Sequence, residues 1–167
     1  MNIQDIMSKP VITCKATDSL DMVAQLMWKN DCGAIAVISD SGRALGMITD
    51  RDICMAAYTQ GSALHTIRVS NAMAGELFAC HPNDSIGVVE RLMSDKQVRR
   101  LPVVDADHRP IGMVSLNDIA RHTISAWGKE PLEHSFVLTF AAICEPRPLV
   151  LARPRPQPLQ QLSDVMS

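Results

Sequence analysis

A chain of 167 residues with a formal net charge of −2 has room for one compact domain or for two small lobes that share a core, and it is too short for several large domains. The hydrophobic share of 47% beside 20% charged residues indicates a folded globular protein and excludes a wholly disordered chain. The charge gives no overall positive field for nucleic acid, and no apolar run approaches the roughly 20 residues that cross a bilayer, so we expect a cytoplasmic protein that binds neither nucleic acid nor membrane.

The cysteines and histidines are scattered along the chain. Five cysteines form an odd number without a C-x-x-C pair, which argues against a disulfide framework or a thiolate metal site. The five histidines contain neither an H-E-x-x-H motif nor a pair at ligand spacing. We therefore expect reduced, mostly buried thiols and no bound metal.

The chain contains an internal duplication. The octapeptide GMITDRDI at residues 46–53 returns as GMVSLNDI at residues 112–119, and residues 3–58 align with residues 69–124 at a constant offset of 66 without a gap. Each copy is therefore one supersecondary unit that is used twice. The matched glycines within the octapeptide suit either a tight turn or the close approach of a ligand.

The first half of each copy predicts a strand followed by a helix. Short apolar runs at residues 11–14 and 77–80 favour the strand. Asp18 and Asp84 then offer an N-cap, and apolar side chains follow at the i, i+3, i+4, i+7 spacing of a helix. We expect these helices to end at the polar stretches 30–31 and 95–97.

The second half of each copy predicts a hairpin and another helix. Pairs of brief apolar runs are separated by turn-rich segments, at residues 35–38 and 45–48 in copy one and at residues 101–104 and 111–114 in copy two. Helices are expected at residues 49–58 and 115–124. The order β-α-β-β-α in each copy indicates an α/β fold of the α+β type.

The two copies define the expected domains, with repeat one at residues 1–65 and repeat two at residues 66–126. A polar connection at residues 59–66 is too short to act as a free linker. Because an isolated three-stranded sheet leaves an apolar face in water, we expect the copies to pack together about a pseudo-twofold axis.

The sequence after the second copy is not repeated. Residues 127–145 predict a C-terminal helix, because Leu132, Phe136 and Phe140 recur at i, i+4, i+8, while a strand over FVLTF is the alternative. Residues 146–167 are rich in proline and arginine and are expected to form a disordered tail.

A hydroxyl and a carboxylate recur where the last helix of each copy begins. Thr49 with Asp52, and Ser115 with Asp118, have the form of a capping box, which is common and contributes about 0.5–2 kcal/mol. The same strand-to-helix junction presents free backbone N–H groups and a positive dipole end, which suit a phosphate, beside a carboxylate that suits two ribose hydroxyls. Both interpretations remain open on the residues alone.

The motif G-h-x-[TS]-x-x-D, which closes each β-α-β-β-α copy, resembles the CBS-domain family, named after cystathionine β-synthase, whose tandem pairs are called Bateman modules. The resemblance covers residues 1–125. The stretch Asp5-Ile6-Met7-Ser8 is similar to the family's D-h-M opening, and Arg99-Arg100-Leu101-Pro102-Val103-Val104 is similar to its basic-h-P-V-V strand. The resemblance implies a pseudo-symmetric pair of copies that dimerises and binds an adenosyl ligand in the clefts between the copies. The ligand would be AMP, ADP, ATP or S-adenosylmethionine.

The resemblance also implies the residues that hold this ligand. The box hydroxyls would contact phosphate or ribose, the box carboxylates would hold the ribose hydroxyls, first- and second-strand residues would hold adenine, and arginines, including Arg99, would hold phosphate. The ligand-binding residues implied in this way are Ile12, Thr13, Ala34, Thr49, Arg51, Asp52, Phe78, Ala79, Arg100, Pro102, Ser115 and Asp118.

The two clefts are expected to be filled unequally. Asp50 beside the first places a negative charge where it opposes phosphate, whereas Leu116 takes that position in the second, near Arg99 and Arg100. The sequence therefore favours the cleft of Ser115 and Asp118.

The function predicted is a stand-alone, non-catalytic regulatory module that needs no cofactor and signals to a separate partner chain of unknown identity. A homodimer is expected. The apolar faces at residues 20–27 and 86–93 are candidate dimer contacts, and the alternative is that these faces are buried within one chain. The alternative is a ligand-free dimerisation scaffold. A hydrolase built on Ser115, Asp118 and His122 ranks last, since no G-x-S-x-G elbow is present and Ala56 replaces the histidine in the first copy.

Overall fold

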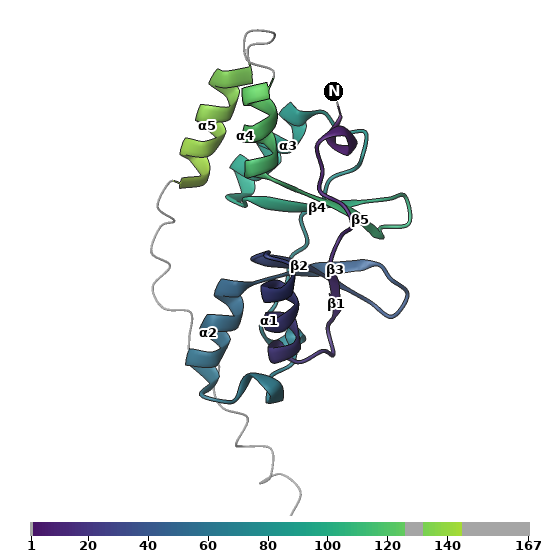
Figure 1. Cartoon of the computed structure of the whole chain (residues 1–167), viewed down its shortest axis with the longest axis vertical. Helices are drawn as coiled ribbons and strands as arrows, with labels where there is room; N and C mark the ends of the chain where they lie inside the picture. The colour runs from purple at the N-terminus through teal and green to yellow at the C-terminus, as the bar shows by residue number, and fades with distance from the viewer. Residues whose placement is uncertain (1, 126–131, 145–167) are drawn as a thin grey trace, which may run out of the picture.

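Two sheets meet in the middle of the molecule, and the helices cover their outer sides (Figure 1). The computed structural model describes residues 2–125 and 132–144. One sheet has three strands in the order β1-β2-β3, and the other pairs β4 with β5. This arrangement places the inner face of each sheet against the other repeat, as the predicted packing of two open sheets requires.

The first repeat follows the predicted order β-α-β-β-α. Parallel pairing of β1 with β2 and antiparallel pairing of β2 with β3 form its sheet, and the register sets Ala34 opposite Thr49. The β2 strand is buried on both faces because the helices cover one side and the second repeat the other. Its elements are β1 Thr13–Lys15, α1 Leu20–Lys29, β2 Ala34–Ile38, β3 Ala44–Thr49 and α2 Asp50–Gln60.

The second repeat has the same helices and hairpin, but its first strand is reduced. The segment at residues 77–80, predicted as a strand, contributes only a parallel bridge between Cys80 and Val103. The rest of its apolar run, including Phe78, packs beside the core without ladder hydrogen bonds. The elements are α3 Ile86–Lys96, β4 Arg100–Val104, β5 Pro110–Ser115 and α4 Leu116–Ser125.

The N-cap of the first helix in each repeat lies one residue later than predicted. Ser19 and Ser85 hold the N-cap positions, and neither makes a side-chain capping bond. Asp18 instead accepts from the backbone N–H of Lys15 at 2.7 Å, and Asp84 from that of His81 at 2.7 Å. These aspartates therefore fix the turn that leads into the helix, which is the Asx pattern that competes with capping.

A thirteen-residue helix, α5 at Leu132–Cys144, lies outside the duplication. A helix was predicted within residues 127–145; it is present over Leu132–Cys144, and the strand alternative for FVLTF is wrong. Residues 127–131 and 145 lie outside the described residues. Phe136 and Phe140 stack along it with ring centroids 6.4 Å apart, and Phe136 and Ile143 pack against the core of the second repeat. The tail predicted at residues 146–167 lies outside the described residues.

The opening segments of the two repeats are exchanged. Ser8 forms an antiparallel bridge with Met113 of β5, and Ile3 is fully buried in the core of the second repeat. At the same offset, Ala74 donates its backbone N–H to Met47 of β3, and Val69 is fully buried in the core of the first repeat. Short 3-10 helices at Ile3–Asp5 and Val69–Asn71 carry these anchors, and a third lies at Leu64–Thr66.

The matched glycines admit these exchanged segments. A Cβ on Gly46 would lie 2.7 Å from the carbonyl oxygen of Ala74, and a Cβ on Gly112 would lie 3.3 Å from that of Ser8. Both glycines thus make room for the close approach of the chain itself, and neither has the positive φ of a tight turn. Contact with a ligand stays a prediction. Glycine is required here for space rather than for an unusual backbone angle.

The apolar faces at residues 20–27 and 86–93 are buried within the chain. Leu20, Val23 and Met27 belong to the core of the first repeat, and Ile86, Val89 and Met93 to that of the second. Of the two interpretations that the sequence left open for these faces, burial within one chain is therefore the correct one.

Candidate functional site

The first strand-to-helix junction is a capping box with unused acceptor capacity. Asp52 Oδ2 accepts from the backbone N–H of Thr49 at 2.9 Å and from its hydroxyl at 2.7 Å, and the backbone N–H of Asp52 reaches Thr49 Oγ1 at 3.2 Å. Among the described residues, no donor engages the second carboxylate oxygen, Oδ1. Asp52 is half-buried, so this oxygen remains within reach of a donor from outside the chain.

The second junction has the same box but no such capacity. Asp118 Oδ2 accepts from the backbone N–H of Ser115 at 2.8 Å and from its hydroxyl. Its Oδ1 accepts from the hydroxyl of Ser8 at 3.4 Å and from the guanidinium of Arg121, which forms an ion pair with it. The Asp118 side chain is only 6% exposed, so the chain's own groups cover it.

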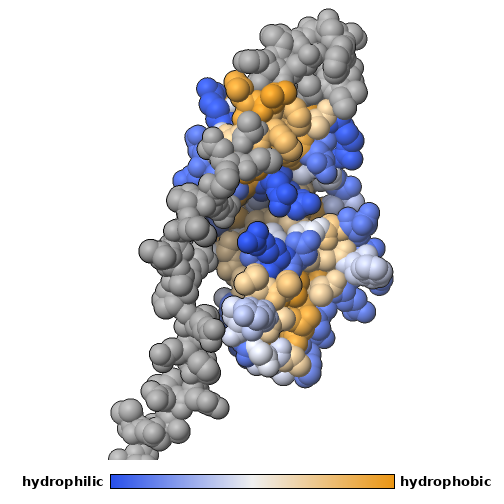
Figure 2. All heavy atoms as spheres, turned by 90° about the vertical axis from the view of Figure 1, so that its left-hand side faces the viewer, coloured by the Kyte–Doolittle hydropathy of each residue, from blue (hydrophilic) through white to orange (hydrophobic). Residues whose placement is uncertain are grey.

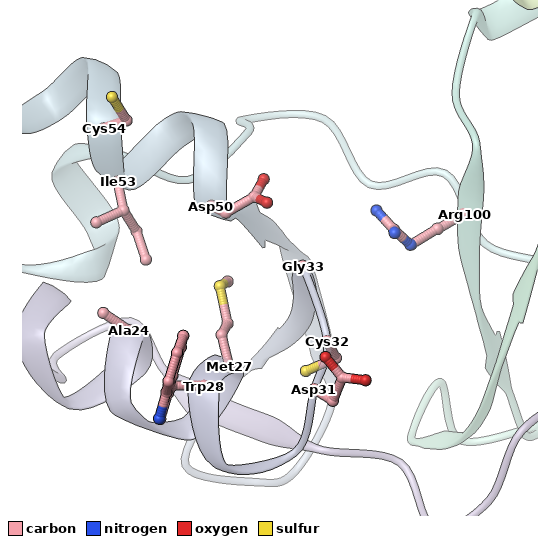
Figure 3. Close-up of a pocket in the computed structure, with 10 residues that line it drawn as sticks. All are labelled: Ala24, Met27, Trp28, Asp31, Cys32, Gly33, Asp50, Ile53, Cys54 and Arg100. Carbon is pink, nitrogen blue, oxygen red and sulfur yellow. The ribbon is translucent and has the colours of Figure 1, made fainter.

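A cavity of about 540 Å³ lies beside the first junction, and both repeats line it. Ligand pockets in proteins occupy about 300–1,000 Å³, so the space is sufficient for a nucleoside. Figure 3 shows Arg100 extending from the second repeat toward Gly33 and Asp50 of the first. The remaining lining comes from α1, α2 and the loop after α1, at Ala24, Met27, Trp28, Asp31, Cys32, Ile53 and Cys54.

Side chains of opposite charge lie on either side of Gly33 in the wall of this cavity. A Cβ on Gly33 would lie 3.0 Å from Asp50 Oδ2 and 3.8 Å from Arg100 Nη1. Arg100 and Asp50 are both exposed, and they belong to different repeats. The arrangement offers one cationic and one anionic contact to a polar ligand, above a floor formed by apolar side chains.

The structure brings some predicted ligand-binding residues together at each junction. Ala34 pairs with Thr49, and Arg100 pairs with Ser115, across the two hairpins. Arg100 is also the only predicted ligand-binding residue that lines the described cavity. Pro102 accepts a hydrogen bond from the backbone of Cys80, which places Ala79 beside it. Of the others, Arg51 is exposed on the first turn of α2, and Ile12 and Thr13 are half-buried at the start of β1.

Phe78, predicted to contact adenine, is engaged within the chain. The ammonium of Lys96 lies 4.9 Å from its ring centroid, a distance at which a cation is attracted to the ring face. At the offset of 66, Ile12 and Asn30 take these positions in the first repeat, so no such pair forms there.

Some residues near the junctions were missed from the sequence as parts of the site. Ser8 and Arg121 engage Asp118, and Gly33 with the side chains from α1, α2 and the loop after α1 lines the cavity. Asp50 was placed beside the first cleft, but only as a charge that opposes phosphate. The i, i+3 spacing of Asp118 and Arg121 on one helix was a readable signal for their ion pair. Ser8 carried no such signal, because it meets Asp118 only through the exchange of opening segments.

Two features bear on metal and membrane binding. Among the described residues, no group of three or more His, Cys, Asp or Glu side chains is arranged to hold a metal ion. Within residues 2–125 and 132–144, no helix is both long and apolar enough to cross a membrane.

The described cysteines are free thiols, namely Cys14, Cys32, Cys54 and Cys80.

Comparison with known proteins identifies the repeats. A family model for the CBS domain matches residues 3–58 and again residues 69–125. Hypoxic response protein 1 of Mycobacterium tuberculosis is 34% identical over 146 residues, which cover 87% of this chain and 96% of that protein. The CBS domain-containing protein YhcV of Bacillus subtilis is 36% identical over 124 residues, which cover 74% of this chain and 86% of that protein.

A solved structure has the same fold and holds ligands. The CBS domain pair of protein MJ0100, in complex with 5′-methylthioadenosine and S-adenosyl-L-methionine, superposes with a TM-score of 0.68 at 26% identity. The match covers 75% of this chain and 97% of that one. A CBS domain pair of this architecture therefore binds adenosyl compounds.

Proposed function

This chain belongs to the CBS-domain family, and from this premise we propose that its two repeats form a non-catalytic regulatory module for an adenosyl ligand. The ligand occupies the space between the repeats and shifts the affinity of the module for a separate partner chain. Such a shift requires that the ligand bind one conformation of the module more tightly than another. AMP, ADP, ATP and S-adenosylmethionine are the candidate ligands.

The observation that carries this proposal is the cavity that both repeats line. Arg100 of β4 lines it together with Gly33 and Asp50 of the first repeat, which precede Ala34 and follow Thr49 directly in the sequence. A micromolar ligand needs about 8 kcal/mol of binding free energy, while a helix dipole contributes about 0.3–1 kcal/mol. The apolar floor and the charged wall must supply the remainder through burial of the purine and charge-assisted hydrogen bonds.

A regulatory role fits the chemistry of the junctions better than a catalytic one. The hydroxyl of Ser115 donates to Asp118, and Ser115 Oγ accepts from the backbone N–H of Asp118, so both side chains serve as the cap of α4. CBS domain pairs in general regulate other proteins. The free thiols described above are compatible with the reducing cytoplasm, where we place the protein.

A homodimer is part of the proposal. Trp28 and Tyr58 are 90% and 79% exposed, and Met55 is 46% exposed, on the outer helices of the first repeat. Figure 2 shows apolar surface over α5 and, beyond a hydrophilic band, over the first repeat. Large apolar side chains grouped in this way are typical of interaction surfaces, and we assign the α1–α2 face to a second copy of the chain.

The competing function is a ligand-free scaffold in which the capping boxes only stabilise helices. The same exposed aromatic residues favour it, because they support association without any ligand. Thermal unfolding separates the two functions. A ligand at 100 times its Kd stabilises the folded state by about 2.7 kcal/mol, so the melting temperature should rise in a saturable way with at least one of AMP, ADP, ATP, S-adenosylmethionine and 5′-methylthioadenosine. No shift with any of the five at millimolar concentration would leave the scaffold as the function.

A further inference from the structure

We propose that each chain binds one adenosyl ligand, at the first junction, because Arg121 and Ser8 close the second junction from within. This inference rests on the proposed function and specifies its stoichiometry and its position. The sequence favours the second cleft, and that preference was never more than a prediction. The present proposal favours the first cleft instead.

The acceptor capacity of the two aspartates carries the argument. A carboxylate offers about four acceptor positions, two on each oxygen. The described contacts of Asp118 fill all four, with Ser115 on Oδ2 and with Arg121 and Ser8 on Oδ1. Those of Asp52 fill two, both from Thr49. A ribose diol that donates to one carboxylate finds acceptor positions at Asp52 and none at Asp118.

The internal symmetry shows where the difference lies. At the offset of 66, Met55 is the counterpart of Arg121 and Ala74 is the counterpart of Ser8. Ala74 and Ser8 hold the same place in the fold, since each bonds to the edge of the opposite hairpin. The two junctions thus share backbone and box, and they differ in two side chains that donate to the second aspartate and cannot donate to the first.

The exposure of the side chains at the second junction also indicates that this junction is closed. Asp118 is 6% exposed, whereas the Arg121 side chain that covers it is 74% exposed. An exposed ion pair alone is weak, but a ligand at the second junction must displace both Arg121 and Ser8 before it reaches the carboxylate. At the first junction no described side chain donates to Oδ1 of Asp52, whose neighbours along α2, Asp50 and Ile53, line the cavity. At the second junction Lys96 also lies over the Phe78 ring.

The test exchanges the two side chains between the repeats. The variant Ser8→Ala/Arg121→Met gives the second junction the side chains of the first, and Ala74→Ser/Met55→Arg gives the first junction those of the second. Both variants use residues that this fold already accommodates at the equivalent position. Arg91→Met serves as the matched control, because it removes an exposed arginine from the second repeat without touching Asp118.

Calorimetric titration with AMP and, separately, with S-adenosylmethionine should give one equivalent per wild-type chain and per Arg91→Met chain. Ser8→Ala/Arg121→Met should give two equivalents. Ala74→Ser/Met55→Arg should lose affinity by about tenfold or more, the scale of hydrogen bonds to a charged group, and Asp52→Asn should do the same. Melting curves of each variant without ligand establish that it is folded.

The outcomes separate this inference from the proposed function. Two equal equivalents in the wild-type chain, or one equivalent that survives Asp52→Asn, overturn the closed second junction and leave the regulatory function intact. An unchanged single equivalent in a folded Ser8→Ala/Arg121→Met chain also overturns it. Absence of binding in the wild type and in both exchange variants overturns the proposed function itself, and the inference with it.

Discussion

The hydroxyl of Ser8 lies 3.4 Å from Oδ1 of Asp118, although 110 positions separate the two residues in the sequence. This contact exists because the opening segment of the chain packs on the second repeat, where Ile3 is fully buried. The first residues of the chain are therefore a structural part of the second repeat.

Truncation of Ile3 should destabilise the second repeat. Ile3→Ala removes three side-chain carbons at a site with no exposure, and large-to-small substitutions of this kind cost about 2–5 kcal/mol. Urea unfolding measures the loss. The neighbouring substitution Gln4→Ala, at an exposed side chain, should stay within about 0.5 kcal/mol. Equal effects of the two variants would mean that the opening segment is not docked as described.

Addition of one methyl group at Gly46 should be costly. Its Cβ would meet the backbone carbonyl of Ala74 at 2.7 Å, and overpacking of this kind costs about 1–3 kcal/mol. Gly87→Ala is the matched control, since Gly87 lies within α3 with open space around it, and alanine there should stabilise the helix by about 0.5–1 kcal/mol. Opposite signs in thermal or urea unfolding are expected, and a neutral Gly46→Ala would refute the close approach.

Cysteine reactivity should follow burial. Burial, with a smaller contribution from the charge of Asp18, raises the pKa of the Cys14 thiol to about 12, and burial with Asp84 does the same for Cys80. Since the thiolate is the reactive form, a maleimide at pH 7 should leave both unmodified in the folded protein. Cys54, which is exposed, should react within minutes. Peptide mapping by mass spectrometry reads each site, and rapid labelling of Cys14 in the folded chain would contradict the core described.

Arg100 should discriminate among adenosyl ligands. Its guanidinium is the cationic group in the cavity wall, so Arg100→Met should weaken AMP and ATP by about 1.5–3 kcal/mol, the range of hydrogen bonds that involve a charged group. The affinity for 5′-methylthioadenosine, which carries no phosphate, should change much less. Calorimetry with Arg109→Met as the control for loss of positive charge decides the matter, and equal losses for all three ligands would remove Arg100 from phosphate recognition.

Charge placed on the α1–α2 face should dissociate the proposed dimer. Met55→Glu and Tyr58→Glu place charge on two exposed side chains of that face that do not line the cavity, and a buried unpaired carboxylate is strongly unfavourable at an interface. Sedimentation velocity should record a monomer for the double variant and a dimer for the wild type. The substitution Val137→Glu on α5, also at an exposed apolar position, should leave the dimer unchanged. A monomeric wild-type chain would end this part of the proposal.

Much of the fold was accessible from the sequence because its signals are local and occur twice. The hairpins, the four helices of the repeats and both capping boxes follow from periodicity and cap residues near in sequence. The strand at residues 77–80 was overestimated for the same reason, since an apolar run does not reveal whether its backbone finds a partner along its whole length. Asp18 and Asp84 were placed one residue wrongly, because cap and turn use the same side chains.

The candidate site was less accessible because its asymmetry depends on contacts distant in sequence. The boxes of Thr49 and Ser115 are equivalent as motifs, and the difference between them comes from Ser8 and Arg121. Asp50 was weighed only for its repulsion of phosphate. Its position near Gly33, with Arg100 of the other repeat close to the same glycine, depends on how the two sheets face each other, which no periodicity in a single chain encodes.

The exchange of opening segments makes each repeat depend on the other for a complete core. A cut between the repeats would leave the second without Ile3 and the first without Val69, both of which are fully buried in the partner repeat. Neither half is therefore a finished folding unit, and damage to one opening segment is felt in the repeat at the other end of the molecule.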